Sequence, residues 1–95
     1  MPTMTEMQIR ALLAEEPDWK LEDGKLVRDW GFKDFVAAMV FVNKVAALAE
    51  GVGHHPDIDI RYNKVRLGLV SHDAGGVTER DANMAKRLGK QFGTA

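Results

Sequence analysis

The only three histidines of the chain lie at the two ends of the stretch GHHPDIDIRYNKVRLGLVSH, which covers residues 53–72. His54 and His55 open this stretch and His72 closes it. Histidine can donate and accept a proton near neutral pH, so two positioned imidazoles could protonate a leaving group and remove a proton elsewhere on one substrate. A single histidine is more often a surface residue without a role, but convergence of all three would indicate acid–base chemistry.

A metal site is the main alternative for these histidines, because imidazole is also a common zinc ligand. Neighbouring residues of a strand point to opposite faces, so His54 and His55 would not naturally bind the same ion. The chain has no HxH or HxxxH spacing and no cysteine that could complete a tetrahedral site. We therefore expect no bound metal.

Two carboxylates, Glu50 and Asp81, could interact with the histidines. Glu50 lies near the end of a predicted helix, where a solvent-exposed carboxylate and a histidine partner are both reasonable interpretations. Asp81 follows Thr78 by three residues, a spacing typical of an N-terminal helix cap. We expect capping to be the main role of Asp81, although it could also border the site.

The segment between the histidines predicts a β-hairpin. DIDIRY and KVRLGLV alternate apolar and polar residues on either side of a turn centred on residues 63–64. With that turn, opposite residues have numbers that sum to 127, so Tyr62 would face Val65. By the same rule His55 would lie opposite His72, on the sheet face that points away from the helices.

The first part of the chain predicts a helix followed by another hairpin. Thr5 and Gln8 have the spacing of a capping box, and Pro17 bounds the helix that they open. The Asp-Gly pair at 23–24 is a strong signal for a two-residue turn. It predicts strands near residues 19–22 and 25–31.

Two more helices complete the expected fold. The segment from about Lys33 to Glu50 is apolar nearly all round, and Gly51 and Gly53 favour its end there. Thr78 opens a last helix through ERDANMAKRLGKQF. The order helix, two strands, helix, two strands, helix predicts an α+β fold with a four-stranded antiparallel sheet and helices packed on one face. Because one sheet face cannot cover the middle helix, we also expect a homo-oligomer.

Composition and charge place the chain among small globular proteins. Its 95 residues suit a single domain over 1–95, with 45% hydrophobic and 28% charged residues. The formal net charge of −1 gives no basic surface for nucleic acid or an anionic membrane. No apolar run approaches the roughly 20 residues of a membrane span, and MPTMTEMQIR lacks the pattern of a secretory signal. We therefore expect a cytoplasmic protein with no nucleic-acid or membrane partner.

The spacing of the chemical residues resembles the signature of the pterin-4a-carbinolamine dehydratases. That signature reads Glu50, three residues, His54-His55-Pro56, five residues, Tyr62, nine residues, His72, eight residues, Asp81. The segments HHPDIDIRYNKV and SHDAGGVTERD are similar to those of bacterial members, and the resemblance covers nearly the whole chain. Ser71 stands where threonine is common and Val77 where leucine is common, and neither departure removes a titratable group.

The resemblance implies a four-stranded antiparallel sheet with helices on one side, assembled into a homodimer or homotetramer. It implies dehydration of 4a-hydroxytetrahydropterin to quinonoid dihydropterin, in recycling of the cofactor of aromatic amino-acid hydroxylases. Neither a metal nor an organic cofactor is implied. Animal members also act as a dimerisation cofactor of a homeodomain transcription factor, and distant relatives serve as assembly chaperones. A protein-binding or coactivator role is therefore the alternative function.

The resemblance also implies roles by motif position. The catalytic histidines would be His54, His72 and His55. The residues that bind, support or line the substrate site would be His55, Glu50, Asp81 and Trp19. From its residue type alone, Trp19 is expected in the core or at its rim, with a stacking role as the alternative. Our hypothesis is that His54 and His72 exchange protons with the substrate while His55 mainly holds the pterin.

Overall fold

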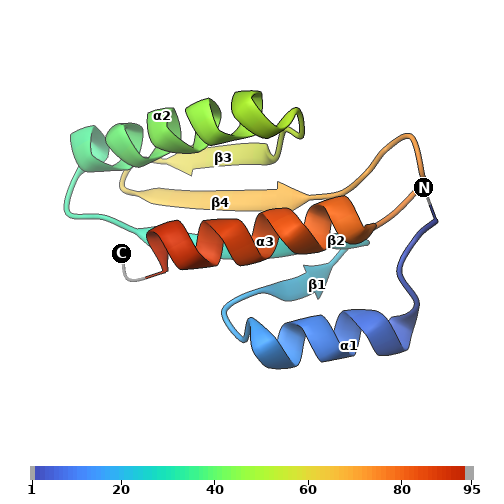
Figure 1. Cartoon of the computed structure of the whole chain (residues 1–95). Coiled ribbons are helices and arrows are strands. Elements are labelled where there is room, and N and C mark those ends of the chain that lie inside the picture. Colours follow the sequence, from blue (N-terminus) through green and yellow to red (C-terminus); the bar gives the residue numbers. More distant parts are fainter. Residues whose placement is uncertain (1, 94–95) are drawn as a thin grey trace.

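The structure, a computed structural model that describes residues 2–93, has the expected α+β fold. Its elements are α1 (Glu6–Glu15), β1 (Lys20–Glu22), β2 (Lys25–Gly31), α2 (Phe35–Val52), β3 (Asp57–Arg61), β4 (Lys64–Leu69) and α3 (Glu79–Phe92). The strands form one antiparallel sheet in the order β1-β2-β4-β3 (Figure 1). The inner strands of the two hairpins, β2 and β4, therefore pair in the middle of the sheet.

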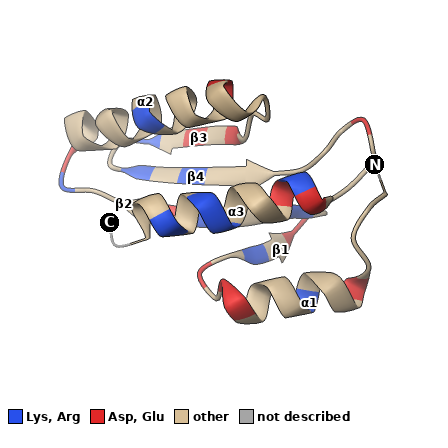
Figure 2. Ribbon diagram, viewed as in Figure 1, with Lys and Arg blue, Asp and Glu red and all other residues tan. Residues whose placement is uncertain are grey.

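One face of the sheet carries the hydrophobic core. Alternate residues of β2 and β4, such as Leu26 and Leu67, are buried on this face, where all three helices contribute to the same cluster. The other face of the sheet carries charged side chains, among them Lys25, Asp29 and Arg66. Figure 2 shows charged residues of both signs along the strands. Packing of the helices on one face is thus confirmed.

Most helix and hairpin boundaries lie where the local cap and turn sequences predict them. Thr5 and Gln8 form a complete capping box at the start of α1, and Thr78 and Asp81 form another at the start of α3. In the first hairpin the turn residues Asp23 and Gly24 have φ values of 52° and 76°. Such a pair of positive φ angles suits the right-handed twist of the strands that it joins, which explains the strength of the Asp-Gly signal.

Helix α2 differs slightly from the predicted segment. It begins after its N-cap Asp34, whose side chain accepts a hydrogen bond from the backbone N–H of Ala37 at 2.8 Å. It runs through Gly51 and ends at Gly53, whose φ of 70° is the left-handed conformation that glycine favours. Gly53 alone therefore ends the helix, because Gly51 still lies within it.

By length and composition alone the 18 residues of α2 could cross a membrane, so the expectation that no apolar run approaches a membrane span is wrong. Its residues Ala38, Phe41, Val42, Val45 and Ala49 are nevertheless buried against the rest of the fold. Core helices of soluble proteins show the same combination, so this helix is weak support for a membrane location.

The predicted register of the second hairpin is wrong by two residues. Arg61 pairs with Lys64, so opposite residues of β3 and β4 have numbers that sum to 125, and the turn consists of Tyr62 and Asn63. Tyr62 has a φ of 54° and does not pair with Val65. Asn63 is held by two 2.8 Å hydrogen bonds to the backbone of Phe32, one from its side chain and one to its carbonyl oxygen. These bonds connect the turn to the end of β2.

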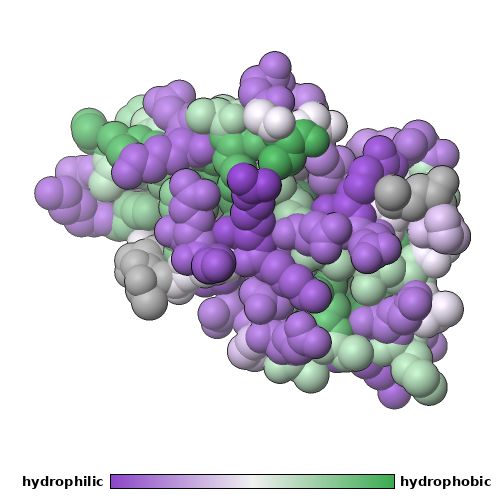
Figure 3. Space-filling view, in the orientation of Figure 1, coloured by the Kyte–Doolittle hydropathy of each residue, from purple (hydrophilic) through white to green (hydrophobic). Residues whose placement is uncertain are grey.

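Several large apolar side chains remain exposed on α2 and on the edge strand β3. Val36 is 71% exposed and Val40 is 49% exposed on the outer side of α2, while Ile58 and Ile60 of β3 are also partly exposed. Figure 3 shows apolar side chains along the part of the surface that α2 forms. The helix thus has more apolar surface than the sheet covers.

Candidate active site

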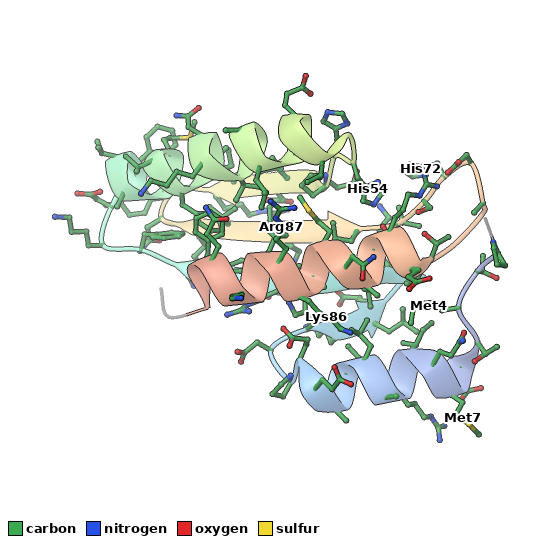
Figure 4. The ribbon with its side chains drawn as sticks, viewed as in Figure 1. Met4, Met7, His54, His72, Lys86 and Arg87 are labelled. Carbon is green, nitrogen blue, oxygen red and sulfur yellow. The ribbon has the colours of Figure 1, made fainter. Side chains whose placement is uncertain are left out.

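The three histidines lie where three elements begin or end. Gly53 turns the chain out of α2, His54 and His55 follow it, and β3 begins at Asp57. His72 lies in the connection between the end of β4 and the start of α3. Figure 4 shows His54 and His72 together at the end of the molecule where α3 begins.

His54 is fixed by a buried carboxylate. Its Nε2 lies 2.5 Å from Oδ1 of Asp81, and its side chain is only 13% exposed. Asp81 is completely buried, and its Oδ2 accepts hydrogen bonds from the backbone N–H of Thr78 at 2.8 Å and from the hydroxyl of Ser71 at 2.9 Å. Asp81 therefore caps α3, as expected, and also positions a histidine.

His55 has a different partner. Its Nε2 contacts Oε2 of Glu50 in the last turn of α2. The two side chains are 61% and 79% exposed, so this contact lies at the surface. Of the two interpretations of Glu50, a histidine partner and a solvent-exposed carboxylate, the structure supports both.

His72 is exposed in a loop that is held by hydrogen bonds within the loop and to α3. The carbonyl oxygen of Ser71 accepts backbone hydrogen bonds from Ala74 and Gly75, at 3.1 and 3.0 Å. Asp73 accepts a 2.6 Å hydrogen bond from Arg80 of α3, and this bond holds the pKa of the Asp73 carboxyl below its usual value. The pair stays charged near neutral pH and connects the loop beside His72 to α3.

The expected pairing of His55 with His72 is wrong. The outermost pair of the β3–β4 ladder is Asp57 with Gly68. Both histidines lie beyond this pair, so neither belongs to the ladder. His55 lies beside Glu50 of a helix rather than on the helix-free face of the sheet. The contact between the two ends of the histidine stretch instead passes through Asp81, which binds both His54 and Ser71, the residue before His72.

Trp19 lies away from this end of the fold. It is 2% exposed in the core, where its ring meets that of Trp30 edge to face at 5.9 Å between centroids. Trp30 in turn donates a hydrogen bond to the carbonyl oxygen of Phe92 at the end of α3. Asp81 and Phe92 lie about 16 Å apart along the helix. Trp19 therefore packs in the core near the opposite end of α3 from His54.

The hydroxyls of Ser71 and Thr78 are site features that the sequence analysis did not identify. Ser71 was noted only as a departure from a motif. A usable signal existed, because Ser71 continues the period of two set by Val65, Leu67 and Leu69, whose side chains point into the core. A hydroxyl that points inward needs a hydrogen-bond partner, which here is Asp81.

Comparison with known proteins identifies the family. The profile of the family described as pterin 4 alpha carbinolamine dehydratase matches residues 2–91. The chain belongs to this family.

Individual relatives agree over nearly the whole chain. A protein of Chloroflexus aurantiacus with the provisional name pterin-4-alpha-carbinolamine dehydratase is 52% identical over 93 residues, which are 98% of this chain and 100% of that one. A protein of Acidobacterium capsulatum with the same provisional name is 59% identical over 88 residues, covering 93% and 96% of the two chains.

Two solved structures share the fold. A transcriptional coactivator/pterin dehydratase from Brucella melitensis has a TM-score of 0.84 and 34% identity, covering 93% of this chain and 96% of its own. A pterin dehydratase-like protein described as a RuBisCO assembly factor in the alpha-carboxysome has a TM-score of 0.62. It is 23% identical over 81% of this chain and 89% of its own, so it supports the fold alone.

In this member of the family, one largely buried, fixed imidazole and two exposed imidazoles lie where α2 ends and α3 begins. His54 is held firmly with its Nδ1 free of any hydrogen bond to the described residues, whereas His55 and His72 are exposed. Within residues 2–93, no group of three or more His, Asp or Glu side chains is arranged to hold a metal ion. The arrangement suits proton transfer to and from a ligand that approaches the surface between α2 and α3.

Proposed function

We propose that this protein is an enzyme that removes water from 4a-hydroxytetrahydropterin to give quinonoid dihydropterin. The bond between C4a and the hydroxyl oxygen breaks, the oxygen leaves as water with an added proton, and a ring N–H loses its proton to form the new C=N bond. The observation that carries the proposal is the fixed His54–Asp81 pair next to the loop of His72, in a chain of this family.

His54 and His72 are assigned the two proton transfers. Because Nε2 of His54 lies against the carboxylate of Asp81, Nδ1 is the nitrogen that remains to exchange a proton with substrate. His72 follows Ser71 directly and shares the same end of the fold, so a bound pterin could contact both. A rigid and an exposed imidazole can divide the tasks of protonating the leaving oxygen and deprotonating the ring.

His55 and Glu50 are assigned to substrate binding. Their contact is exposed, so a pterin can replace water around both side chains without opening the core. The pterin ring has both donors and acceptors of hydrogen bonds, and this pair presents one of each. The reaction would serve to recycle the tetrahydropterin cofactor of an aromatic amino-acid hydroxylase, and a cytoplasmic location belongs to the same proposal.

The alternative is a protein-binding role without catalysis. The exposed apolar side chains of α2, such as Val36 and Val40, favour it, because such a role would use this helix and would not need the histidines. The solved relative from Brucella melitensis is described as a transcriptional coactivator as well as a pterin dehydratase. Retention of three histidines with two carboxylate partners favours the enzyme.

The test is a direct dehydration assay on chemically generated 4a-hydroxytetrahydropterin, with and without a chelator. Wild-type protein should accelerate the reaction, and the chelator should leave the rate unchanged. Replacement of His54 or His72 with alanine should lower turnover by about 10²–10⁴-fold. Replacement of His55 should act mainly on the Michaelis constant.

Lys90→Ala, at an exposed position near the other end of α3, is the control and should retain the wild-type rate. A wild-type protein that does not accelerate dehydration would refute the proposal and favour the protein-binding role. Loss of activity with chelator and its return with zinc would refute the proposed metal-free mechanism.

A further inference from the structure

The side chain of Asp81 ends a buried chain of hydrogen bonds that begins in the first turn of α3. The backbone N–H of Arg80 donates to the hydroxyl of Thr78 at 3.3 Å, and the hydroxyls of Thr78 and Ser71 lie 2.8 Å apart. Ser71 lies 2.9 Å from Oδ2 of Asp81. Ser71, Thr78 and Asp81 are all almost completely buried, so solvent does not compete for these groups.

The distances fix the direction of the protons. Each hydroxyl has one proton, and two hydroxyls must supply the contact between them and the contact with the carboxylate. If Ser71 donated to Thr78, the 2.9 Å contact between Ser71 and Asp81 would join two oxygens without a proton. The hydroxyl of Thr78 lies 3.5 Å from Asp81, too far for a good alternative bond. Thr78 therefore donates to Ser71, and Ser71 donates to Asp81.

Every donor in this series of hydrogen bonds points toward the carboxylate of Asp81. Oδ2 of Asp81 receives the hydroxyl of Ser71 and the backbone N–H of Thr78, which leaves Oδ1 for His54. A carboxylate with both oxygens held cannot rotate, so the imidazole of His54 is held in one orientation with its proton on Nε2. Nδ1 is the nitrogen that remains for a ligand.

We propose that Ser71 is a positioning residue of the site, whose hydroxyl orients Asp81 and thereby keeps the neutral His54 ring as the Nε2–H tautomer with Nδ1 toward substrate. The assignment rests on the proposed function for its catalytic consequence, but the tautomer is a property of the protein alone. Ser71 also precedes His72 in the chain, so one residue is connected to both proton-transferring histidines, through its side chain to one and through its peptide bond to the other.

The tautomer can be measured without substrate. Two-dimensional ¹⁵N–¹H NMR of histidine-labelled protein, at a pH where the rings are neutral, distinguishes a proton on Nε2 from one on Nδ1. Wild-type His54 should show a proton on Nε2 that exchanges slowly with water because it is hydrogen-bonded. Ser71→Ala should lose that slow exchange, and Ser71→Thr, which keeps the hydroxyl, should restore it. A proton on Nδ1 of wild-type His54 would overturn the proposal before any variant is made.

Kinetics give the second measurement. Turnover of Ser71→Ala should fall roughly 10- to 100-fold with a smaller change in the Michaelis constant, and Ser71→Thr should recover most of it. Asp34→Ala is the matched control, because it removes the N-cap at the start of α2, and His54 follows the opposite end of this helix. It should lower stability without changing the His54 spectrum.

The outcomes separate the two proposals. If Ser71→Ala keeps both the wild-type His54 spectrum and the wild-type turnover, the positioning role is wrong. If the spectrum changes as expected but the wild-type protein does not dehydrate the carbinolamine, the positioning role stands and the proposed function is wrong. If Ser71→Ala does not fold, Ser71→Cys, whose thiol is only a weak donor, takes its place: it should show the same loss of slow exchange, and a wild-type His54 spectrum with wild-type turnover would refute the positioning role.

Discussion

His54 and His55 are neighbours in the chain, but their imidazoles contact carboxylates on two different helices. His54 reaches a buried aspartate in the first turn of α3, and His55 reaches an exposed glutamate in the last turn of α2. The left-handed Gly53 before them and Pro56 after them leave this short segment outside both α2 and β3, so the two side chains can diverge. One imidazole is therefore part of the fold and the other belongs to the surface.

The two carboxylate partners should differ in their effect on stability. Asp81→Ala should lower the free energy of unfolding by about 1–3 kcal/mol, because it leaves buried donors of Ser71 and Thr78 without an acceptor. Glu50→Ala should change it by less than about 1 kcal/mol, since even a charged pair at this exposure contributes little. Urea denaturation of both variants checks the difference, and equal losses would contradict it.

Tyr62 offers a test of the hairpin register. A residue other than glycine at positive φ carries a conformational cost of about 1 kcal/mol, so Tyr62→Gly should raise the midpoint of thermal unfolding. With a turn at residues 63–64, Tyr62 would instead be a strand residue, and glycine there would weaken the strand. A lower midpoint for Tyr62→Gly would therefore favour the register that the structure excludes.

Local signals were enough to predict much of this fold. The Asp23-Gly24 turn and the capping boxes at Thr5 and Thr78 depend on residues within a few positions of each other, so the sequence predicted them correctly. The second register could not be predicted in this way. A slip of two residues leaves Ile58 and Ile60 on the same face, so the apolar pattern fits both registers. The long-range bonds between Asn63 and Phe32 belong only to the observed one.

The convergence of the histidines at one end of the fold could be predicted, but their contacts could not. The types and spacing of the histidines indicated acid–base chemistry, and they do lie at one end of the fold. Which carboxylate each histidine contacts depends on how α2 and α3 pack, and the sequence pattern does not contain that information. The motif implied that Trp19 lines or braces the site, whereas the residues alone predicted a core or rim position, and the structure places Trp19 in the core.

We predict that the protein is a homo-oligomer in which the outer side of α2 is an interface. Val36 and Val40 are too exposed for an apolar helix of a monomer, and a second copy would cover them. Wild-type protein at micromolar concentration should have a multiple of the monomer mass by light scattering. The double variant Val36→Lys with Val40→Lys should have a lower mass by the same measurement.

Met7→Lys on α1 is the matched control for assembly. Met7 is 80% exposed, but it lies on another helix, so its replacement should leave the mass of the oligomer unchanged. A monomer mass for the wild-type protein would refute the assembly prediction.

The charged face of the sheet should contribute a pH-dependent part of stability. The side-chain hydrogen bond from Arg66 holds the pKa of Asp29 below its usual value of 3.8. The unfolded chain therefore binds this proton at higher pH than the folded chain, so the contribution is complete above the unfolded pKa and is lost as the pH falls through the folded pKa. Asp29→Asn should destabilise the protein at pH 7 by less than about 1 kcal/mol, and the difference should shrink toward pH 2–3.

Measurements of urea denaturation at both pH values check this prediction. Added salt at pH 7 should also reduce the effect of Asp29→Asn, because the pair is partly exposed. A loss of stability that is independent of pH and salt would mean that Asp29 acts through packing rather than charge.

The position of β2 and β4 in the middle of the sheet has a consequence for how quickly the chain reaches its native state. Each hairpin closes a loop of two residues, but the pairing of Leu26 with Leu69 and of Gly31 with Lys64 closes a loop that contains α2 and β3. Closing that loop costs chain entropy before its contacts can compensate. Formation of the central pairing of β2 with β4, rather than of either hairpin, should therefore set the folding rate. The region that contains His54, His55 and His72, which lies beyond the Leu26–Leu69 pair, should form last.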